Sequence, residues 1–209
     1  FFHDFIHKNR GVEGRSVDFL SICSPNYLHH VHILAGLRLG CSVVCEKPLV
    51  SAIEFLDELS DAEFETGQKV YTILQLRHHG SVQRLFNQVQ QSSHDSKFDV
   101  DLTYVTSRGP WYLKSWKNDS AKSFGVVSNI GIHFFDMLGY VFGELKETEI
   151  YVKTKTKASG FLHFERARVR WFLSIDRDDL PGGSGAAQST FRNPEINGKA
   201  FEFSDGFND

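Results

Sequence analysis

Three side chains that can hold or move a proton stand at informative places in the sequence. Lys47 directly follows an apolar, strand-like run, in the step Glu46-Lys47-Pro48. Asn129 and His133 are four residues apart, so on a helix they lie on one face. A histidine titrates near neutral pH, and the surroundings of a lysine can lower its pKa. A lysine, a histidine and an amide that converge on one crevice can carry out proton transfer.

Each of these residues also has an ordinary structural interpretation. A lysine at a strand end is usually solvated, and a histidine beside Phe134 and Phe135 is usually a hydrogen-bonded core residue. Asn129 could cap a helix, and Pro48 could simply end a strand. The case for chemistry therefore depends on whether the fold brings the three side chains together.

The segment 17–75 alternates between short apolar runs and runs with helical spacing, which predicts strand, helix, strand, helix, strand. The expected strands are 17–23, 42–46 and 69–75. They are almost continuously apolar, the pattern of a parallel sheet covered on both faces. Ligands of such sheets bind at the carboxyl ends of the strands, where 23–26 and 46–48 fall.

After residue 75 the pattern changes to strands that alternate between polar and apolar residues, with helical runs at 81–91 and 128–143. The pair Asn197-Gly198 between two strand-like runs predicts a hairpin. We therefore predict an α/β plus α+β chain. Residues 1–76 would be the C-terminal part of a Rossmann dinucleotide-binding domain. Residues 77–209 would be a substrate-binding and oligomerisation α+β domain with an open, mostly antiparallel sheet.

Composition narrows the class of protein. The 209 residues are 41% hydrophobic, enough for a packed core, and a formal net charge of −3 argues against a nucleic-acid partner. The three cysteines, Cys23, Cys41 and Cys45, are expected to be small buried residues and not disulfides or metal ligands. Because no apolar run approaches the ~20 residues of a membrane span and no signal peptide is visible, we expect a cytoplasmic protein without a membrane partner.

Two motifs carry a resemblance to a known family. SICSPNYLHHVHILAGLRLGCSVVCEKPL, residues 21–49, and NIGIHFFDML, residues 129–138, resemble the Gfo/Idh/MocA oxidoreductases. The stretch 102–143 and the ending FEFSDGF are similar, more narrowly, to the bacterial UDP-N-acetyl-glucosaminuronate 3-dehydrogenases. Those enzymes serve the synthesis of surface polysaccharides such as the lipopolysaccharide O-antigen.

The resemblance implies that NAD lies on the first domain and a sugar on the sheet of the second. Hydride would pass from C3 of UDP-2-acetamido-2-deoxyglucuronate to the nicotinamide. Lys47 would contact the reacting hydroxyl, His133 would be the general base, and Asn129 would orient sugar or nicotinamide. Many relatives have Asp at position 129; since an amide cannot take up a proton, the role of base falls to His133 or Lys47. The Lys-Pro bond of this family is often cis.

The resemblance also implies binding contacts, and no metal site. The implied cofactor contacts are Cys23, Ser24, Pro25, Asn26, His29, Glu46 and Lys47. The candidate substrate contacts are Arg77, Arg108, Trp111, Tyr112, Trp116, Asn129 and His133. The arginines could bind an anionic group and the aromatic rings could stack on uracil or sugar. The alternatives are a surface arginine, rings packed in a core or interface, and, for His29, a solvated helix start.

The sequence also departs from the family pattern. No G-x-G-x-x-G turn precedes Val17, and residues 1–16 are too short for the strand, turn and helix that bind a pyrophosphate. We therefore expect a fragment of an ordinary enzyme, incomplete at both ends, that by itself is inactive and binds NAD weakly or not at all. A natural short form that acts as a sugar-nucleotide-binding or assembly module is the alternative. Phe124, where relatives tend to have Gly, leaves other sugar or polyol dehydrogenase activities open. A homo-oligomer is expected.

Overall fold

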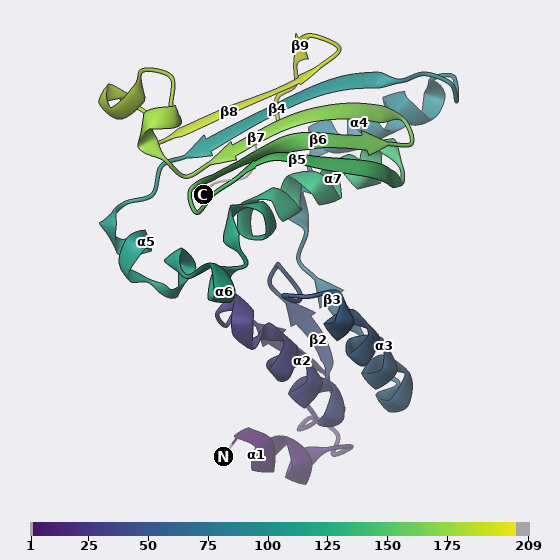
Figure 1. The fold of residues 1–209 in the computed structure, drawn as a ribbon. Coiled ribbons are helices and arrows are strands. Elements are labelled where there is room, and N and C mark those ends of the chain that lie inside the picture. Colours follow the sequence, from purple (N-terminus) through teal and green to yellow (C-terminus); the bar gives the residue numbers. More distant parts are fainter. Residues whose placement is uncertain (1, 204–209) are drawn as a thin grey trace. The chain divides into compact units, whose positions relative to one another are not determined.

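The structure is a computed structural model that describes residues 2–203. The chain divides into two compact units (Figure 1). The first comprises Phe1–Ile73 with Ala121–Phe124, and the second Leu74–Ser120 with Gly125–Asp209. Residues 204–207 of the FEFSDGF ending lie outside the described part of the chain.

The first unit is a parallel sheet with helices between its strands. Its elements are α1 (Phe2–Asn9), β1 (Phe19–Ile22), the 3₁₀ turn η1 (Asn26–Leu28), α2 (His29–Arg38), β2 (Ser42–Cys45), α3 (Glu54–Thr66) and β3 (Val70–Thr72). The strands pair in parallel in the order β1-β2-β3, which confirms the predicted alternation of strand and helix. Gly67 ends α3 with a φ of 68°, a left-handed conformation that costs glycine least.

Among the described residues of the first unit, only one face of the sheet is covered by helices α2 and α3. Ile33 and Leu37 of α2, and Leu59 of α3, pack with Val43 of β2 in one hydrophobic cluster. Right-handed crossovers between adjacent parallel strands place both helices on the same face of a sheet. Phe19 and Tyr71 are 61% and 51% exposed, with ring centroids 6.4 Å apart. The expectation of a sheet covered on both faces is therefore wrong for the part of the chain that is described.

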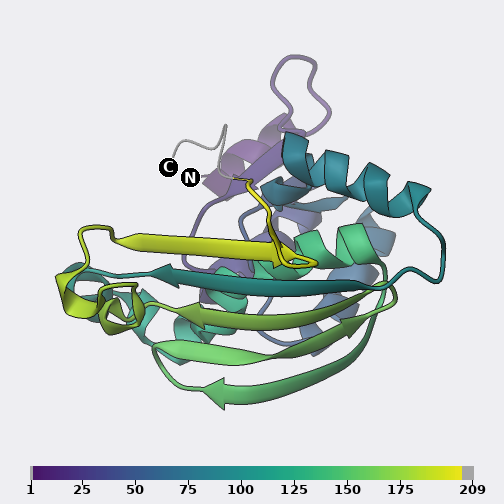
Figure 2. The same cartoon turned by 90° about the horizontal axis from the view of Figure 1, so that it is seen from above.

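The second unit is a six-stranded sheet with two long helices on one face (Figure 1). Its strands are β4 (Phe98–Thr106), β5 (Leu145–Lys153), β6 (Lys157–Phe164), β7 (Ala167–Ser174), β8 (Thr190–Ile196) and β9 (Lys199–Ala200). The order is β5-β6-β7-β4-β8-β9, and only the β4–β7 pair is parallel. The mostly antiparallel sheet is as predicted, and Figure 2 shows its strands from the side opposite the helices.

Helices α4 (Gly80–Gln91) and α7 (Ile132–Phe142) pack against one face of this sheet. The short helices are α5 (Pro110–Lys114) and α6 (Ser120–Ser123), and all of α6 except Ser120 belongs to the first unit. The shorter turns are η2 (Gln75–His78), η3 (Trp116–Asn118), the π turn η4 (Val127–Gly131), η5 (Arg177–Asp179) and η6 (Gly183–Gly185). Met137, Leu138 and Val141 of α7 pack in the core with Leu173 of β7.

The apolar run Ser120–Phe142 and the hairpin at Asn197-Gly198 bear on two predictions from the sequence. The run Ser120–Phe142 is, by length and composition, apolar enough to cross a membrane, so the expectation that no run approaches that length is wrong. Phe134 and Phe142 of this run are buried in the core, which is the position of a core helix in a globular domain. The predicted hairpin is confirmed, with φ values of 51° at Asn197 and 71° at Gly198.

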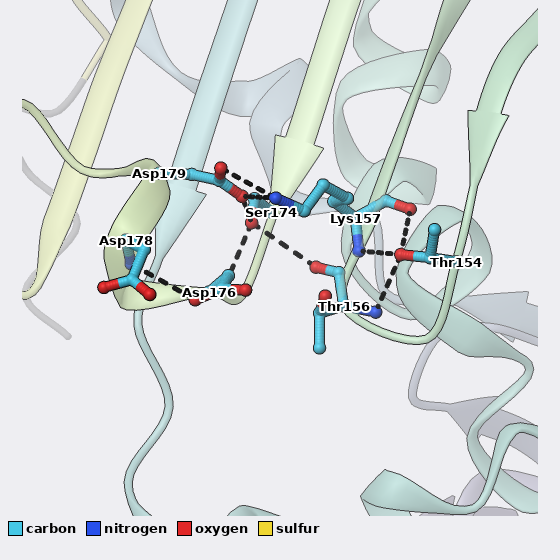
Figure 3. A network of polar contacts seen from close by, with 7 residues as sticks. All are labelled: Thr154, Thr156, Lys157, Ser174, Asp176, Asp178 and Asp179. Carbon is cyan, nitrogen blue, oxygen red and sulfur yellow. Dashed lines mark hydrogen bonds and ion pairs between the residues drawn. The ribbon is translucent and has the colours of Figure 1, made fainter. Parts of the chain in front are cut away.

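The segment 176–189, a loop by composition, is anchored to the sheet by a polar network (Figure 3). Lys157 Nζ donates to Asp179 Oδ1 at 2.8 Å, and Ser174 Oγ donates to Asp179 Oδ2 at 2.6 Å. Burial works against the charged form of Asp179, but the hydrogen bonds from Lys157 and Ser174 outweigh it, so the pKa of Asp179 lies below its ordinary value. The Asp176 carboxylate accepts a hydrogen bond from the Asp178 amide at 3.2 Å.

Candidate active site

The carboxyl ends of β1 and β2 bring two of the predicted motifs to the same level. Ile22 is the register partner of Cys45, and the amide of Glu46 donates to the Ile22 carbonyl at 2.9 Å. Residues 23–26 and 46–48 therefore leave the sheet side by side. The Lys47-Pro48 peptide bond is cis, as the resemblance implied, and Lys47 is half-buried.

His29 lies in the interior of the first unit and not at its surface. Its side chain has no exposed area. Nδ1 is 2.8 Å from the Pro48 carbonyl oxygen, and Nε2 is 2.8 Å from the Ser24 carbonyl oxygen. The interpretation as a solvated helix start is wrong, and no surface of His29 is open to a cofactor. The imidazole instead connects the two loops that carry the expected cofactor contacts.

Two further expected cofactor contacts are also engaged with the protein. The Asn26 side chain is 6% exposed, and its Nδ2 donates to the Ser123 carbonyl at 3.0 Å, within the same compact unit. The Ser24 hydroxyl is 2.9 Å from His32 Nδ1. His32 was missed by the sequence analysis, although its spacing of three from His29 places both rings on one face of α2.

The cysteines near this loop differ from one another in exposure. Cys41 and Cys45 are buried, as expected, but Cys23 is exposed at the strand end, so the expectation is wrong for Cys23. Burial, followed by the charges of Glu46 and Cys23, raises the pKa of the Cys45 thiol to about 12. Cys45 is therefore a neutral core residue. Among residues 2–203 no group of three or more metal-ligating side chains comes together.

In the second unit, Asn129 and His133 lie where a π turn joins α7. The turn η4 contains Asn129, and His133 is half-buried in the first turn of α7. Sequence spacing predicted one ordinary helix here; single π turns occur often at functional sites. Gly131 allows the close packing, since a Cβ there would lie 2.5 Å from Phe135 Cε2 and 2.9 Å from Leu173 Cδ1.

The aromatic residues expected to bind substrate have different positions. Tyr112 is 4% exposed and hydrogen-bonds to Asn129; burial raises the pKa of the Tyr112 hydroxyl, while Arg108 and Asn129 act in the opposite direction. Trp111 is 55% exposed. Lys117 Nζ lies 5.4 Å from the Trp111 ring centroid and 5.7 Å from that of Trp116. Trp111 is therefore the more exposed ring, with Lys117 over it, whereas Tyr112 is buried and contacts Asn129.

The two arginines expected to bind an anion also differ. Arg108 is exposed, and its backbone amide donates to the Ile175 carbonyl at 3.3 Å. The Arg77 guanidinium makes a two-pronged ion pair with Asp136, in which Nε lies 2.6 Å from Oδ2. In this structure the Arg77 side chain is engaged by the protein, whereas the Arg108 side chain is exposed.

Comparison with known families assigns both halves of the chain. Residues 7–74 match the Gfo/Idh/MocA model described as "Oxidoreductase family, NAD-binding Rossmann fold". Residues 96–199 match the model described as "Oxidoreductase family, C-terminal alpha/beta domain". The chain belongs to the Gfo/Idh/MocA oxidoreductase family. The resemblance carried by the two sequence motifs is thereby confirmed.

Several Gfo/Idh/MocA proteins are similar to this chain over much of its length. The WlbA (WbpB) dehydrogenase from Thermus thermophilus in complex with NAD and alpha-ketoglutarate is 46% identical, with a TM-score of 0.90 over 99% of this chain and 66% of that one. The complex of the same enzyme with NAD and UDP-GlcNAcA has 46% identity and a TM-score of 0.89, covering 98% and 66%.

Curated relatives are more distant. D-glucoside 3-dehydrogenase of Escherichia coli K12 is 29% identical over 60% of this chain and 36% of its own length. The putative UDP-kanosamine synthase oxidoreductase subunit of Amycolatopsis mediterranei S699 is 29% identical over 84% and 46%, respectively. The chain thus spans less than half the length of these two curated Gfo/Idh/MocA relatives.

The described residues fit part of a dinucleotide site of the Gfo/Idh/MocA type. Parallel strand ends at Ile22 and Cys45 deliver the loops 23–26 and 46–48, the place where such sheets bind ligands. Within the described residues before β1 there is no glycine-rich turn of the kind that holds a pyrophosphate. Only the two strand-end loops, 23–26 and 46–48, therefore match what a dinucleotide site requires. The roles of single residues in these loops stay predictions.

Proposed function

We propose that the protein carrying this chain is an NAD-dependent dehydrogenase that oxidises the C3 hydroxyl of UDP-2-acetamido-2-deoxyglucuronate to a ketone. The observation that carries this proposal is the 46% identity, over 98% of this chain, to a T. thermophilus dehydrogenase crystallised with NAD and UDP-GlcNAcA. Relatives named D-glucoside 3-dehydrogenase and glucose-6-phosphate 3-dehydrogenase support oxidation at C3.

The chemical roles follow from what each side chain can do. NAD, when bound, accepts the hydride. Lys47, at the end of β2, would hold the reacting hydroxyl and favour loss of its proton. His133 would accept that proton, since Asn129 has no basic group. The hydrogen bond between Tyr112 and Asn129 fixes the amide in one orientation, which suits an orienting role for Asn129.

The proposed binding contacts include residues of each unit. In the first unit, Cys23, Ser24, Pro25 and Glu46 have exposed or half-buried side chains at strand ends and are the proposed contacts of NAD. In the second unit, we propose that Arg108 binds a negatively charged group of the substrate. We also propose that the sugar or uracil ring of the substrate stacks on Trp111 and Trp116. We assign a supporting role to Arg77, Tyr112, Asn26 and His29, because each is already engaged with the protein.

The proposal also covers the setting of the reaction. The 3-keto sugar would serve bacterial surface polysaccharide synthesis, such as that of the lipopolysaccharide O-antigen, in the cytoplasm. The enzyme would be a homo-oligomer.

The test is an assay of the complete gene product with NAD and UDP-GlcNAcA, in which the absorbance of NADH is followed. We expect turnover with this sugar, and a decrease in kcat of about 10²-fold or more for Lys47→Ala. A Lys47→Ala protein that keeps wild-type turnover would contradict the assigned role. Sugar binding that is kept while both proteins lack turnover would support a non-catalytic binding module.

A second candidate is another sugar or polyol dehydrogenase activity. It is favoured by the curated relatives, whose names include scyllo-inositol 2-dehydrogenase and 1,5-anhydro-D-fructose reductase. The same assay with free myo-inositol and glucose separates the two proposals. Turnover with one of these compounds in place of UDP-GlcNAcA would identify the second candidate.

A further inference from the structure

We infer that His29 is a positioning residue that holds the Lys47 loop against the expected cofactor loop, and that it acts on the reaction through Lys47. This inference rests on the proposed function. His29 cannot be a catalytic residue, because its side chain has no exposed area with which to touch a substrate or cofactor.

The contacts of the ring place it between two strand ends. Ser24 follows β1, and Pro48 follows β2. The carbonyl oxygens of these two residues lie 2.8 Å from opposite nitrogens of the imidazole. A neutral ring has one N–H to donate and a charged ring has two, so at least one carbonyl accepts a hydrogen bond in either state. The His29 imidazole therefore contacts both loops directly.

The main chain around Lys47 is held on both sides. Before it, the Glu46 amide donates to the Ile22 carbonyl at 2.9 Å, the bond that continues the β1–β2 ladder. After it, the Pro48 carbonyl contacts His29. These two contacts, one on each side of Lys47, constrain the direction in which its side chain leaves the sheet. A shift of about 1 Å in a reacting group can lower a rate by about 10²-fold.

The cofactor loop is connected to α2 by two histidines, which provides a matched control. His29 contacts the Ser24 carbonyl, and His32 contacts the Ser24 hydroxyl at 2.9 Å. The His32 ring contacts the cofactor loop, whereas the His29 ring contacts both the cofactor loop and the Lys47 loop. Removal of the His32 ring therefore disturbs one loop, and removal of the His29 ring disturbs both.

The experiment compares His29→Phe, His29→Asn, His29→Gln and His32→Phe in the complete gene product. Phe keeps a ring without a donor. The amide of Asn stands near the place of Nδ1 and can bond Pro48, while that of Gln stands near the place of Nε2 and can bond Ser24. Each variant is measured by kcat, by KM for NAD and for the sugar, and by amide hydrogen exchange of the peptide 46–50.

We expect His29→Phe to lower kcat by about tenfold to a hundredfold and to speed exchange in the peptide 46–50. His29→Asn should restore most of kcat, and His29→Gln should restore KM for NAD more than kcat. His32→Phe, whose ring contacts the cofactor loop, should raise KM for NAD but leave exchange at 46–50 close to wild type. If His29→Phe does not fold, the comparison of His29→Asn with His29→Gln tests the inference.

Equal kcat in His29→Asn and His29→Gln, or wild-type exchange at 46–50 in both, would overturn the inference. Failure of the proposed function is seen separately, as a wild-type protein that forms no NADH from UDP-GlcNAcA. In that case hydrogen exchange still tests whether His29 holds the Lys47 loop. Slower exchange at 46–50 in His29→Asn than in His29→Gln supports the inference, and equal exchange overturns it.

Discussion

Arg77 and Asp136 form a two-pronged ion pair that joins the turn η2 to helix α7. Nε of Arg77 donates to Oδ2 of Asp136 at 2.6 Å, and a second guanidinium nitrogen donates to Oδ1. The hydrogen bond to Asp136 raises the pKa of Arg77, and the guanidinium lies 5.5 Å from the centroid of the Tyr140 ring. Because α7 also carries His133, this pair contributes to the support of the proposed base.

Replacement of Arg77 tests this structural role. The Asp136 side chain is 8% exposed, so Arg77→Ala would leave a nearly buried carboxylate without its ion-pair partner. We expect the free energy of unfolding to fall by about 1–3 kcal/mol, and less for Arg77→Lys, which keeps the charge without the two-pronged geometry. Urea unfolding measures the stability of both Arg77 variants. Asp136→Asn, alone and combined with Arg77→Ala, completes a double-mutant cycle. Unchanged stability together with weaker sugar binding would instead indicate an anion site.

Asp179 and Lys157 predict a pH dependence of stability. Because the folded pKa of Asp179 is below its unfolded value of about 3.9, its contribution is present above that pH and is lost as the pH falls through the folded pKa. The pKa of Lys157 is raised by its hydrogen bond to Asp179, so its contribution is present below about pH 10.4 and is lost as the pH rises further. The loss of this stability at low pH and at high pH can therefore be measured.

The measurement is denaturant unfolding of wild type and Asp179→Asn at a series of pH values. At neutral pH the variant should be less stable by about 1–2 kcal/mol, and the difference should shrink below about pH 4. Glu144→Gln is the matched control, since the Glu144–Lys146 pair is exposed to solvent, and it should change stability little. A difference between wild type and Asp179→Asn that stays constant down to about pH 3 would contradict the assignment.

Gly160 is a position in β6 where no side chain fits. A Cβ there would lie 2.1 Å from the Glu149 carbonyl oxygen and 2.9 Å from Trp171 Cζ2. We expect Gly160→Ala to lower the free energy of unfolding by about 1–3 kcal/mol or more, because backbone of β5 must move. Gly185→Ala is the control, since nothing lies within 4 Å of its Cβ. Equal stability of the two variants in denaturant unfolding would rule out this account.

Local signals in the sequence were sufficient for most of the fold, because they depend on neighbours along the chain. The predicted turn at Asn197-Gly198 follows from backbone conformations that these residues favour. Contacts between distant residues were not predictable in this way. Arg77 and Asp136 are 59 positions apart, and nothing in either residue type distinguishes a protein partner from a ligand.

His29 and η4 show the same limit at the candidate site. The sequence placed His29 at a helix start, but whether its ring faces solvent, a cofactor or two carbonyl groups depends on how β1 and β2 pair. The widened turn at Val127–Gly131 depends on how closely Gly131 approaches Phe135 and Leu173. The motifs therefore predicted which residues are candidates, and packing decides which side chains remain open.

Phe124 carries the last prediction, because it adopts a backbone conformation that suits glycine. Its φ is 65°, in the left-handed region, where a side chain costs about 1–2 kcal/mol. The family resemblance implies that relatives tend to have Gly at this position, and this φ gives a physical reason. Phe124→Gly and Phe124→Ala both remove the ring, but only Ala keeps a Cβ at this φ. We expect Phe124→Gly to be the more stable of the two by about 1 kcal/mol in denaturant unfolding.

Ala121→Gly provides the opposite control for this prediction. Ala121 lies in helix α6, where glycine is less favourable than alanine by up to about 1 kcal/mol. The order of stability should therefore be glycine above alanine at position 124 and alanine above glycine at position 121. If alanine is favoured at both positions, the left-handed conformation of Phe124 is not what limits the residue there. Opposite orders at two positions three residues apart would assign the effect to backbone conformation.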